Sequence, residues 1–143
     1  MVTAKIKKIT DTAVIPTRGS SKAAGYDLYA DETVDIEPGV CVKVSTGLSI
    51  TPPEGYFGAI FARSGLAIKQ GLRPGNCVGA CDEDYTGEYI VALYNDGSKT
   101  HVVNKGDRIA QLVFLPYLDV EFEEVEELNE TKRGAGGFGS TGV

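Results

Sequence analysis

The sequence predicts an all-β fold, a sandwich or a barrel built from many short strands. Short apolar or alternating segments recur along the 143 residues, and turns rich in glycine and proline separate them. Only one stretch, at 63–71, has the composition and flanking residues of a helix. Many short strands with such turns and almost no helix are typical of sandwiches and barrels.

The clearest strand is expected at 40–50, where apolar side chains recur at every second position. This period of two separates a core face from an outer face. The core face is predicted to carry Val40, Val42, Val44, Leu48 and Ile50. An edge strand is expected at 3–9, because its lysines discourage further pairing. Other strands are expected at 26–29, 34–36, 56–62, 89–94, 100–103, 109–115 and 118–123, the last with a less regular helix at 122–128 as its alternative.

The single expected helix also offers a candidate anion site. Ser64 is placed to cap its start, and Gly71 is placed to end it. Unpaired N–H groups at a helix start attract anions, and Arg63 and Ser64 stand at that end. The segment is interpreted either as a phosphate seat or as an ordinary cap with a surface arginine.

Length and charge limit the class of partner. A chain of 143 residues is most simply one domain with a substantial core. The formal net charge of −6 argues against a DNA or RNA polymer, because such partners require a basic surface. A single nucleotide is compatible with this charge, since a divalent ion can neutralise its phosphates.

Residue usage also indicates the compartment. The first eleven residues contain no apolar signal-peptide region, and no stretch reaches the length of a membrane span. Three cysteines, an odd number, fit a reducing compartment. We therefore expect a cytoplasmic protein, or a nuclear or host-cell protein if it is eukaryotic or viral, and not a secreted one.

The single histidine restricts the chemistry further. Cys77 and Cys81 are interpreted as small buried residues rather than metal ligands, because His101 is the only histidine in the chain. His101 lies in a predicted strand and no serine nucleophile motif is present, which argues against Ser-His-Asp chemistry.

The candidate chemistry is concentrated at 75–88. Asn76, Cys77 and Val78 are expected to form one arm of a hairpin, and three acidic residues follow at 82–84. Carboxylates at the mouth of a hairpin suit either a base for water or a metal site. An aspartate-rich surface turn is the alternative, since Asp and Gly dominate turns.

Two polar features toward the C-terminus also point to a ligand. Gln111 lies in an otherwise apolar strand, and its buried amide needs a partner, for which a ligand is one candidate. Residues 131–143 combine five glycines with Arg133 and Phe138, a composition that suits an arm closing over an anionic, aromatic ligand. A disordered tail is the alternative. The chain is therefore divided into one β domain, 1–130, and a flexible C-terminal arm, 131–143.

Five segments together resemble the motifs of the trimeric dUTP diphosphatase (dUTPase) family, in the family's order and spacing. They lie at 24–28, 63–67, 79–88, 106–111 and 133–142, so that they span nearly the whole chain. The resemblance implies a jelly-roll-like subunit in a homotrimer, with the arm of one subunit covering an active site formed by others. It implies hydrolysis of dUTP at the α-phosphate to dUMP and pyrophosphate with Mg²⁺. Such an activity limits uracil incorporation into DNA and supplies dUMP for thymidylate synthesis.

The resemblance also implies roles for single residues. Asp82 matches the family's water-activating aspartate, Tyr85 matches the residue beneath the deoxyribose, and Asp27 matches the link to the water shell of the metal. Substrate contacts are implied for Arg63, Ser64, Gly65, Asn76, Ala80, Cys81, Tyr85, Ile90, Gln111, Arg133, Phe138 and Gly139. Ala62, Ala80 and Cys81 differ from the family's usual residues, although no functional side chain is lost. A dCTP deaminase of the same fold and a non-catalytic nucleotide-binding protein are the alternatives.

Overall fold

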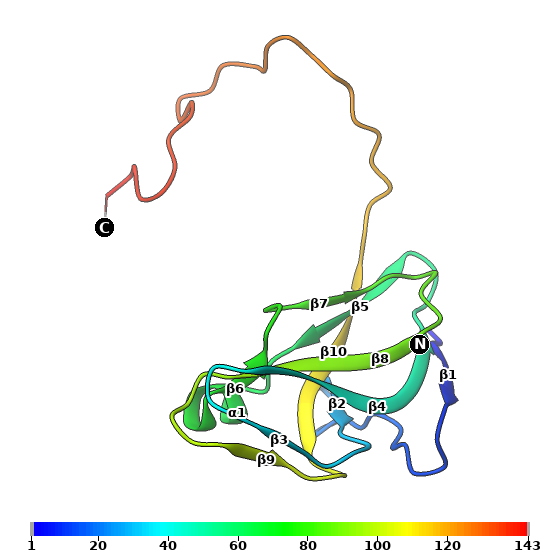
Figure 1. The fold of residues 1–143 in the computed structure, drawn as a ribbon. Coiled ribbons are helices and arrows are strands. Elements are labelled where there is room, and N and C mark those ends of the chain that lie inside the picture. The colour runs from blue at the N-terminus through cyan, green and yellow to red at the C-terminus, as the bar shows by residue number, and fades with distance from the viewer. Residues whose placement is uncertain (1, 143) are drawn as a thin grey trace.

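The expected β-rich architecture with one short helix is confirmed by the computed structural model, which describes residues 2–142. Met1 and Val143, the ends of the two predicted ranges, lie outside the described residues. Figure 1 shows the elements, which are β1 (Lys5–Lys8), β2 (Tyr26–Tyr29), β3 (Val34–Ile36), β4 (Cys41–Thr51), β5 (Tyr56–Phe61), α1 (Ser64–Gln70), β6 (Leu72–Pro74), β7 (Gly79–Cys81), β8 (Glu88–Asn95), β9 (His101–Val103) and β10 (Arg108–Pro116).

Two four-stranded antiparallel sheets form the body and enclose one core. Their strand orders are β1-β4-β8-β6 and β2-β10-β5-β7, and β3 pairs with β9 in a separate two-stranded sheet. The core cluster takes buried residues from both large sheets, Leu48 and Leu93 from one and Leu28 and Leu112 from the other. This arrangement is a sandwich. The barrel alternative is wrong, because each large sheet ends in two edge strands and is not closed.

Strand β4 keeps the predicted period of two but interrupts it with a bulge. Val44, Leu48 and Ile50 are buried as expected, whereas Val40 lies outside the strand and is exposed. The register with β8 shifts between Ser45 and Ser49, where Gly47 has a φ of 65°. The carboxylate of Glu88 accepts hydrogen bonds from the Ser45 hydroxyl and, at 2.8 Å, from the Gly47 N–H. The bulge is therefore held by a side chain of the neighbouring strand.

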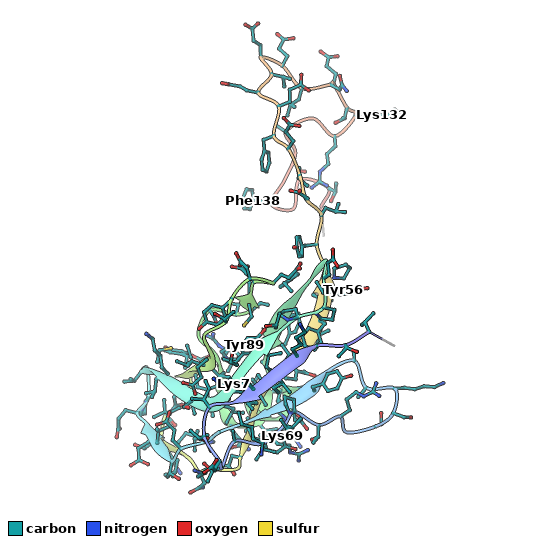
Figure 2. All side chains as sticks on the ribbon, turned by 90° about the vertical axis from the view of Figure 1, so that its right-hand side faces the viewer. Lys7, Tyr56, Lys69, Tyr89, Lys132 and Phe138 are labelled. Carbon is teal, nitrogen blue, oxygen red and sulfur yellow. The ribbon has the colours of Figure 1, made fainter. Side chains whose placement is uncertain are left out.

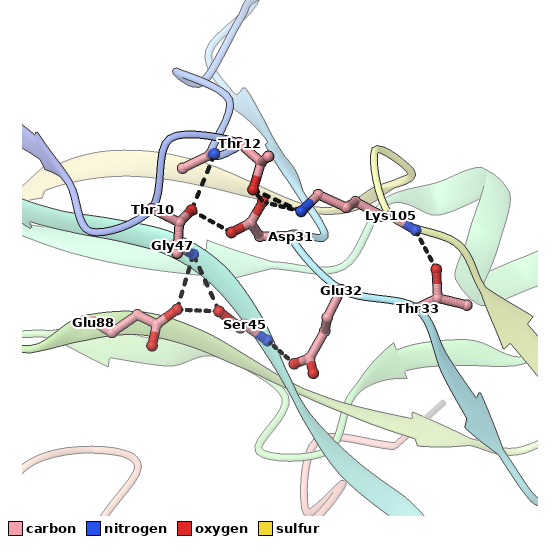
Figure 3. A network of polar contacts seen from close by, with 10 residues as sticks. Thr10, Thr12, Asp31, Glu32, Thr33, Ser45, Gly47, Glu88 and Lys105 are labelled. Carbon is pink, nitrogen blue, oxygen red and sulfur yellow. Dashed lines mark hydrogen bonds and ion pairs between the residues drawn. The ribbon is translucent and has the colours of Figure 1, made fainter.

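A polar network beside this bulge connects three loops (Figure 3). The carboxylate of Asp31 accepts hydrogen bonds from Thr10 and, at 2.7 Å, from Thr12, and it forms a 3.3 Å ion pair with Lys105. The hydrogen bond from Thr10 lowers the pKa of Asp31 below its ordinary value, and Thr12 and Lys105 act in the same direction against the effect of burial. The network joins the segments that follow β1 and β2 to the turn before β10.

The helix α1 begins at Ser64, one residue earlier than a cap at Ser64 would imply. Arg63 is the N-cap residue, with extended backbone (φ −86°, ψ 124°) and no side-chain cap bond, so the predicted cap at Ser64 is wrong. Gly71 ends the helix in the left-handed conformation, as predicted, at φ 68°. No helix in the described part of the chain is long and apolar enough to cross a membrane.

Beyond β10 the chain extends away from the body with no helix or strand among residues 117–142 (Figure 1). The strand expected at 118–123 and its helical alternative are therefore wrong, and Leu118, Val120 and Phe122 are exposed. An alternating segment becomes a strand only against a partner edge, and no described element pairs with this one. The segment carries a series of carboxylates, at Asp119, Glu121, Glu123, Glu124, Glu126, Glu127 and Glu130.

Candidate active site

Asp82 lies where the chain passes from one large sheet to the other. Strand β7 pairs with β5, whereas β8 pairs with β4 and β6, so residues 82–87 connect the two sheets. The expectation that residues 76–78 form one arm of a hairpin is wrong. Those residues belong to the turn before β7, because Cys77 has a φ of 64° and cannot continue a strand. Asp82 follows the end of β7 and is exposed.

A small pocket beside this connection brings together six of the predicted site residues. Its volume is about 230 Å³, and Ile60, Gly79, Glu88 and Tyr89 complete its lining. Ile90 reaches the pocket because β8 alternates between core and outer faces. The predicted residues in the lining are Asn76, Ala80, Cys81, Asp82, Tyr85 and Ile90.

Tyr85 is held rigidly at the edge of this pocket. Its ring stacks on that of Tyr89, with centroids 6.3 Å apart and an interplanar angle of 27°. Its hydroxyl donates a 2.9 Å hydrogen bond to the carbonyl of Glu88. A Cβ atom at Gly87 would collide with the same ring, so a glycine is required there. The exposed face of Tyr85 thus forms a fixed platform for a flat ligand group.

The burial of the residues near the Tyr85 platform was predicted only in part from the sequence. Cys81 is buried as predicted, whereas Cys77 is exposed because it occupies a surface turn. Tyr89 is fully buried, and its hydroxyl lies beside the Cys81 thiol without a hydrogen-bond partner among the described residues. Burial raises the pKa of both groups, so both stay protonated near neutral pH.

A second group of predicted residues is assembled by neighbouring strands. Asp27 on β2 and Gln111 on β10 are cross-strand partners, and Gln111 also pairs with Phe61 on β5. Asp27 forms ion pairs with Arg63 Nε at 3.1 Å and with Arg108 Nη1 at 3.2 Å. Arg108 was not identified from the sequence as a site residue, although it lies within the segment 106–111.

This group is closed by backbone contacts. Arg63 donates to the carbonyl of Arg108 at 2.9 Å, and Gln111 Nε2 donates to the carbonyl of Ala62 at 2.8 Å. The amide of Gln111 therefore has a partner within the chain and does not require a ligand for this purpose. Ser64 and Gly65 follow directly as the first two residues of α1, and both are exposed.

A larger cleft of about 680 Å³ lies on the other side of Asp82. Ala80 and Asp82 line both this cleft and the small pocket. Glu83 and Asp84, two of the three acidic residues at 82–84, complete it with Phe57 and with Tyr117, which the sequence did not single out. Asp82 therefore lines two cavities and is exposed at the boundary between them.

With this geometry in place, comparison with known proteins is decisive. The family model for dUTPase matches residues 11–142. The chain belongs to the dUTPase family. The deoxyuridine 5'-triphosphate nucleotidohydrolase of Desulfitobacterium hafniense is 54% identical over 132 residues, which cover 90% of this chain and 87% of the relative. The Saccharomyces cerevisiae protein of the same name is 45% identical over 139 residues, covering 96% and 93%.

Solved dUTPase structures share the fold. A variant of the dUTPase of Staphylococcus bacteriophage 80alpha with dUpNHpp superimposes with a TM-score of 0.89 at 31% identity, covering 99% of each chain. A variant of the dUTPase from phage phi11 of S. aureus, whose structure concerns the coordination of a structural Mg(II) ion, has a TM-score of 0.83 at 27% identity, covering 90% of this chain and 99% of its own.

The third group of predicted residues lies apart from the other two in this dUTPase chain. Arg133, Phe138 and Gly139 belong to the C-terminal segment, and Figure 2 shows Phe138 beyond the body. The Arg133 guanidinium donates to the carbonyl of Gly136, and the Phe138 ring is exposed. Neither cavity beside Asp82 includes any of the three.

The donor set indicates how a dUTPase of this sequence would accommodate Mg²⁺. Among the described residues, no three His, Cys, Asp or Glu side chains are grouped to hold a metal. Both oxygens of Asp27 are already paired with arginines. The residues therefore fit the ordinary Mg²⁺ arrangement, in which substrate phosphates and water supply most ligands.

Proposed function

We propose that this protein hydrolyses dUTP at the α-phosphate to dUMP and pyrophosphate, using water activated by Asp82. Membership of the dUTPase family and the names of its relatives support the substrate. The observation that carries the mechanism is the place of Asp82, exposed at the boundary of two cavities and adjacent to the Tyr85 platform. This reaction would limit uracil incorporation into DNA and supply dUMP for thymidylate synthesis.

Asp82 acts in this proposal as the general base. Its carboxylate forms no hydrogen bond or ion pair with the side chains described, so both oxygens are free to accept a proton from water. Transfer of that proton as water attacks phosphorus contributes roughly 10²–10⁴ in rate. The proton passes to the carboxylate, the new P–O bond forms at the α-phosphorus, and pyrophosphate leaves with the electrons of the broken bond.

Arg63, Ser64, Gly65 and Gln111 are proposed to contact the phosphates. Asp27 orients the Arg63 guanidinium through its 3.1 Å ion pair, which limits the conformational freedom that phosphate binding would otherwise remove. When bound, Mg²⁺ would neutralise part of the phosphate charge and polarise the phosphoryl oxygens. Asp27 would contact that ion through its water shell.

Base and sugar selection are proposed to lie in the small pocket. Asn76, Ala80, Cys81 and Ile90 form walls in which main-chain groups can pair with the edge of uracil. Such a wall would leave the amino group of cytosine mispaired, and buried unpaired polar groups are strongly disfavoured. The Tyr85 platform would pack beneath the deoxyribose and leave no room for a 2′-hydroxyl.

A complete site is proposed to require a homotrimer of jelly-roll-like subunits. Within one chain, the small pocket, the Asp27 group and the residues Arg133, Phe138 and Gly139 form separate groups. We infer that the arm, 131–143, of one subunit closes over the pocket of another, where Arg133 would contact phosphate and Phe138 would stack on uracil. The arm would thereby exclude bulk water from the reacting phosphate.

Substitution of Asp82 tests the function and the mechanism together. Asp82→Asn keeps the shape but removes the base, so pyrophosphate release from dUTP with Mg²⁺ should fall by about 10²–10⁴. Asp96→Asn, an exposed aspartate of the turn after β8, is the control and should retain wild-type turnover. Equal rates in wild type and Asp82→Asn would contradict the assigned role. The same assay with dTTP, dCTP and UTP should show little turnover, and ammonia release from dCTP would instead indicate a deaminase.

A further inference from the structure

Three segments of the chain meet at the carboxylate of Glu83. Its Oε2 atom accepts a 2.9 Å hydrogen bond from the N–H of Gly55, in the turn before β5, and a 2.5 Å hydrogen bond from the hydroxyl of Tyr117. The backbone N–H of Tyr117 in turn donates to the carbonyl of Gly55 at 3.1 Å. We name Gly55, Glu83 and Tyr117 the Glu83 junction.

The Glu83 junction holds the connection that carries Asp82. Residues 82–87 contain one internal backbone bond, from the Tyr85 N–H to the Asp82 carbonyl at 3.1 Å. The far end of the connection is held by Ser49, whose hydroxyl donates to the Thr86 carbonyl at 2.8 Å. The near end, directly after Asp82, is held by Glu83. The side chain of Glu83 therefore fixes the backbone from which the proposed base projects.

The Glu83 junction also marks the point where the C-terminal segment leaves the body. Strand β10 ends at Pro116, and Tyr117 is the first residue beyond it. Tyr117 lines the larger cleft together with Asp82 and Glu83. One contact thus joins the connection that carries Asp82 to the base of the segment that carries Arg133 and Phe138.

The hydrogen bond between Tyr117 and Glu83 is of a kind that can hold two segments in a fixed relative position. A hydrogen bond between a phenol and a carboxylate is charge-assisted and stronger than a neutral pair. Its effect is visible in both partners, because the Tyr117 hydroxyl lowers the pKa of Glu83 and Glu83 raises the pKa of Tyr117. The carboxylate consequently remains ionised and bonded across the neutral pH range.

We propose that Glu83 is a positioning residue for the reaction, acting through its hydrogen bond to Tyr117. The bond fixes the position of Asp82 at the wall of the larger cleft. It also fixes this position relative to Tyr117, where the C-terminal segment leaves the body. This inference rests on the proposed dUTP hydrolysis. It adds a residue that has no contact of its own with the reacting atoms.

A double-mutant cycle with Tyr117→Phe and Glu83→Ala tests the kinetic consequence. Tyr117→Phe removes only the hydroxyl, and kcat for dUTP should fall by about three- to tenfold, equivalent to one net hydrogen bond, while KM changes by less than about twofold. The double variant should be no slower than Glu83→Ala alone, because both changes break the same contact. Glu54→Gln, an exposed carboxylate in the same turn as Gly55, is the control and should keep the wild-type kcat.

Hydrogen exchange supplies a readout that is independent of activity. In Tyr117→Phe, the hydrogen-bonded amides of Gly55, Tyr85 and Tyr117 should exchange about three- to tenfold faster than in wild type, with the core of β8 unchanged. Unchanged exchange together with unchanged kcat overturns the inference. If the wild type releases no pyrophosphate from dUTP, the proposed function fails and exchange alone decides: faster exchange supports the Glu83 junction, and unchanged exchange overturns it.

Discussion

Tyr89 places a phenol hydroxyl inside the core without a hydrogen-bond partner among the described residues. Its ring supports Tyr85 by stacking, and its hydroxyl lies beside the Cys81 thiol, a weak donor and acceptor. A buried hydroxyl without a good partner is unfavourable, because it loses its hydrogen bonds to water. The ring of Tyr89 therefore stabilises the platform, and its oxygen contributes little.

Replacement of Tyr89 separates these two contributions. Tyr89→Phe keeps the ring and removes the unpaired oxygen, so the free energy of unfolding should stay the same or rise by up to about 1 kcal/mol. Tyr89→Ala removes the ring and should lower the free energy of unfolding by about 3–5 kcal/mol. Urea unfolding of both variants measures the difference. A loss of more than about 1 kcal/mol in Tyr89→Phe would show that the hydroxyl is well bonded.

The bulge in β4 depends on one glycine. Gly47 has a φ of 65°, and a Cβ atom there would lie 2.6 Å from both Asp31 Oδ2 and Thr10 Oγ1 and 2.9 Å from Ala13 Cβ. The Asp31 network therefore occupies the space that a side chain would need. Gly39, in the turn before β4, has a comparable φ of 75°, but a Cβ atom at that position would have no neighbour within 4 Å.

These two glycines form a matched pair for measuring the packing at the bulge. Gly39→Ala should lower the free energy of unfolding by about 1 kcal/mol, the cost of a left-handed backbone for alanine. Gly47→Ala should lower it by about 3 kcal/mol or more, because the Thr10–Asp31 contacts must also shift. Thermal or urea unfolding compares the two. Equal losses would mean that the loops around Asp31 adapt without cost.

Elements specified by local patterns were predictable from the sequence, and those that depend on distant partners were not. The alternation in β4 and the glycine end of α1 are local signals, and both were predicted. The segment at 118–123 has the same alternation but pairs with no strand among residues 2–142, so its pattern did not yield a strand. The partner of Gln111 was also out of reach, because the Ala62 carbonyl lies 49 residues away in sequence.

The residues of the candidate site also divide into those that a local stretch of sequence specifies and those that depend on distant partners. The six residues around the small pocket lie within 76–90, and the resemblance to the family implied a role for each of them. The second arginine on Asp27 and the Glu83 junction arise from pairings between strands remote in the chain. Sequence spacing alone carried no signal for either contact.

At the scale of the whole molecule, the C-terminal segment is separable from the folded body. The core cluster contains no residue beyond β10, so deletion of 131–143 should change the free energy of unfolding by less than about 1 kcal/mol. Turnover of dUTP should nevertheless be nearly abolished, because Arg133 and Phe138 would be lost. Thermal unfolding measures the first property, and pyrophosphate release measures the second.

Point substitutions refine this test. Arg133→Ala should reproduce much of the loss of turnover, whereas Lys132→Ala, at the neighbouring cation, should retain most of the activity. Full turnover after the deletion would show that the arm does not act as a lid.

Most of the net negative charge of the chain lies in the segment beyond β10. Seven of its twenty acidic residues lie at 117–130, where no basic residue is found, whereas residues 1–116 contain 12 basic and 13 acidic residues and have a net charge of −1. At physiological ionic strength, repulsion from exposed charges fades over about 8 Å. A polyphosphate that approaches the sandwich therefore meets a surface with a net charge close to zero and no long-range electrostatic barrier. Arg63 and Arg108 provide local attraction on this surface.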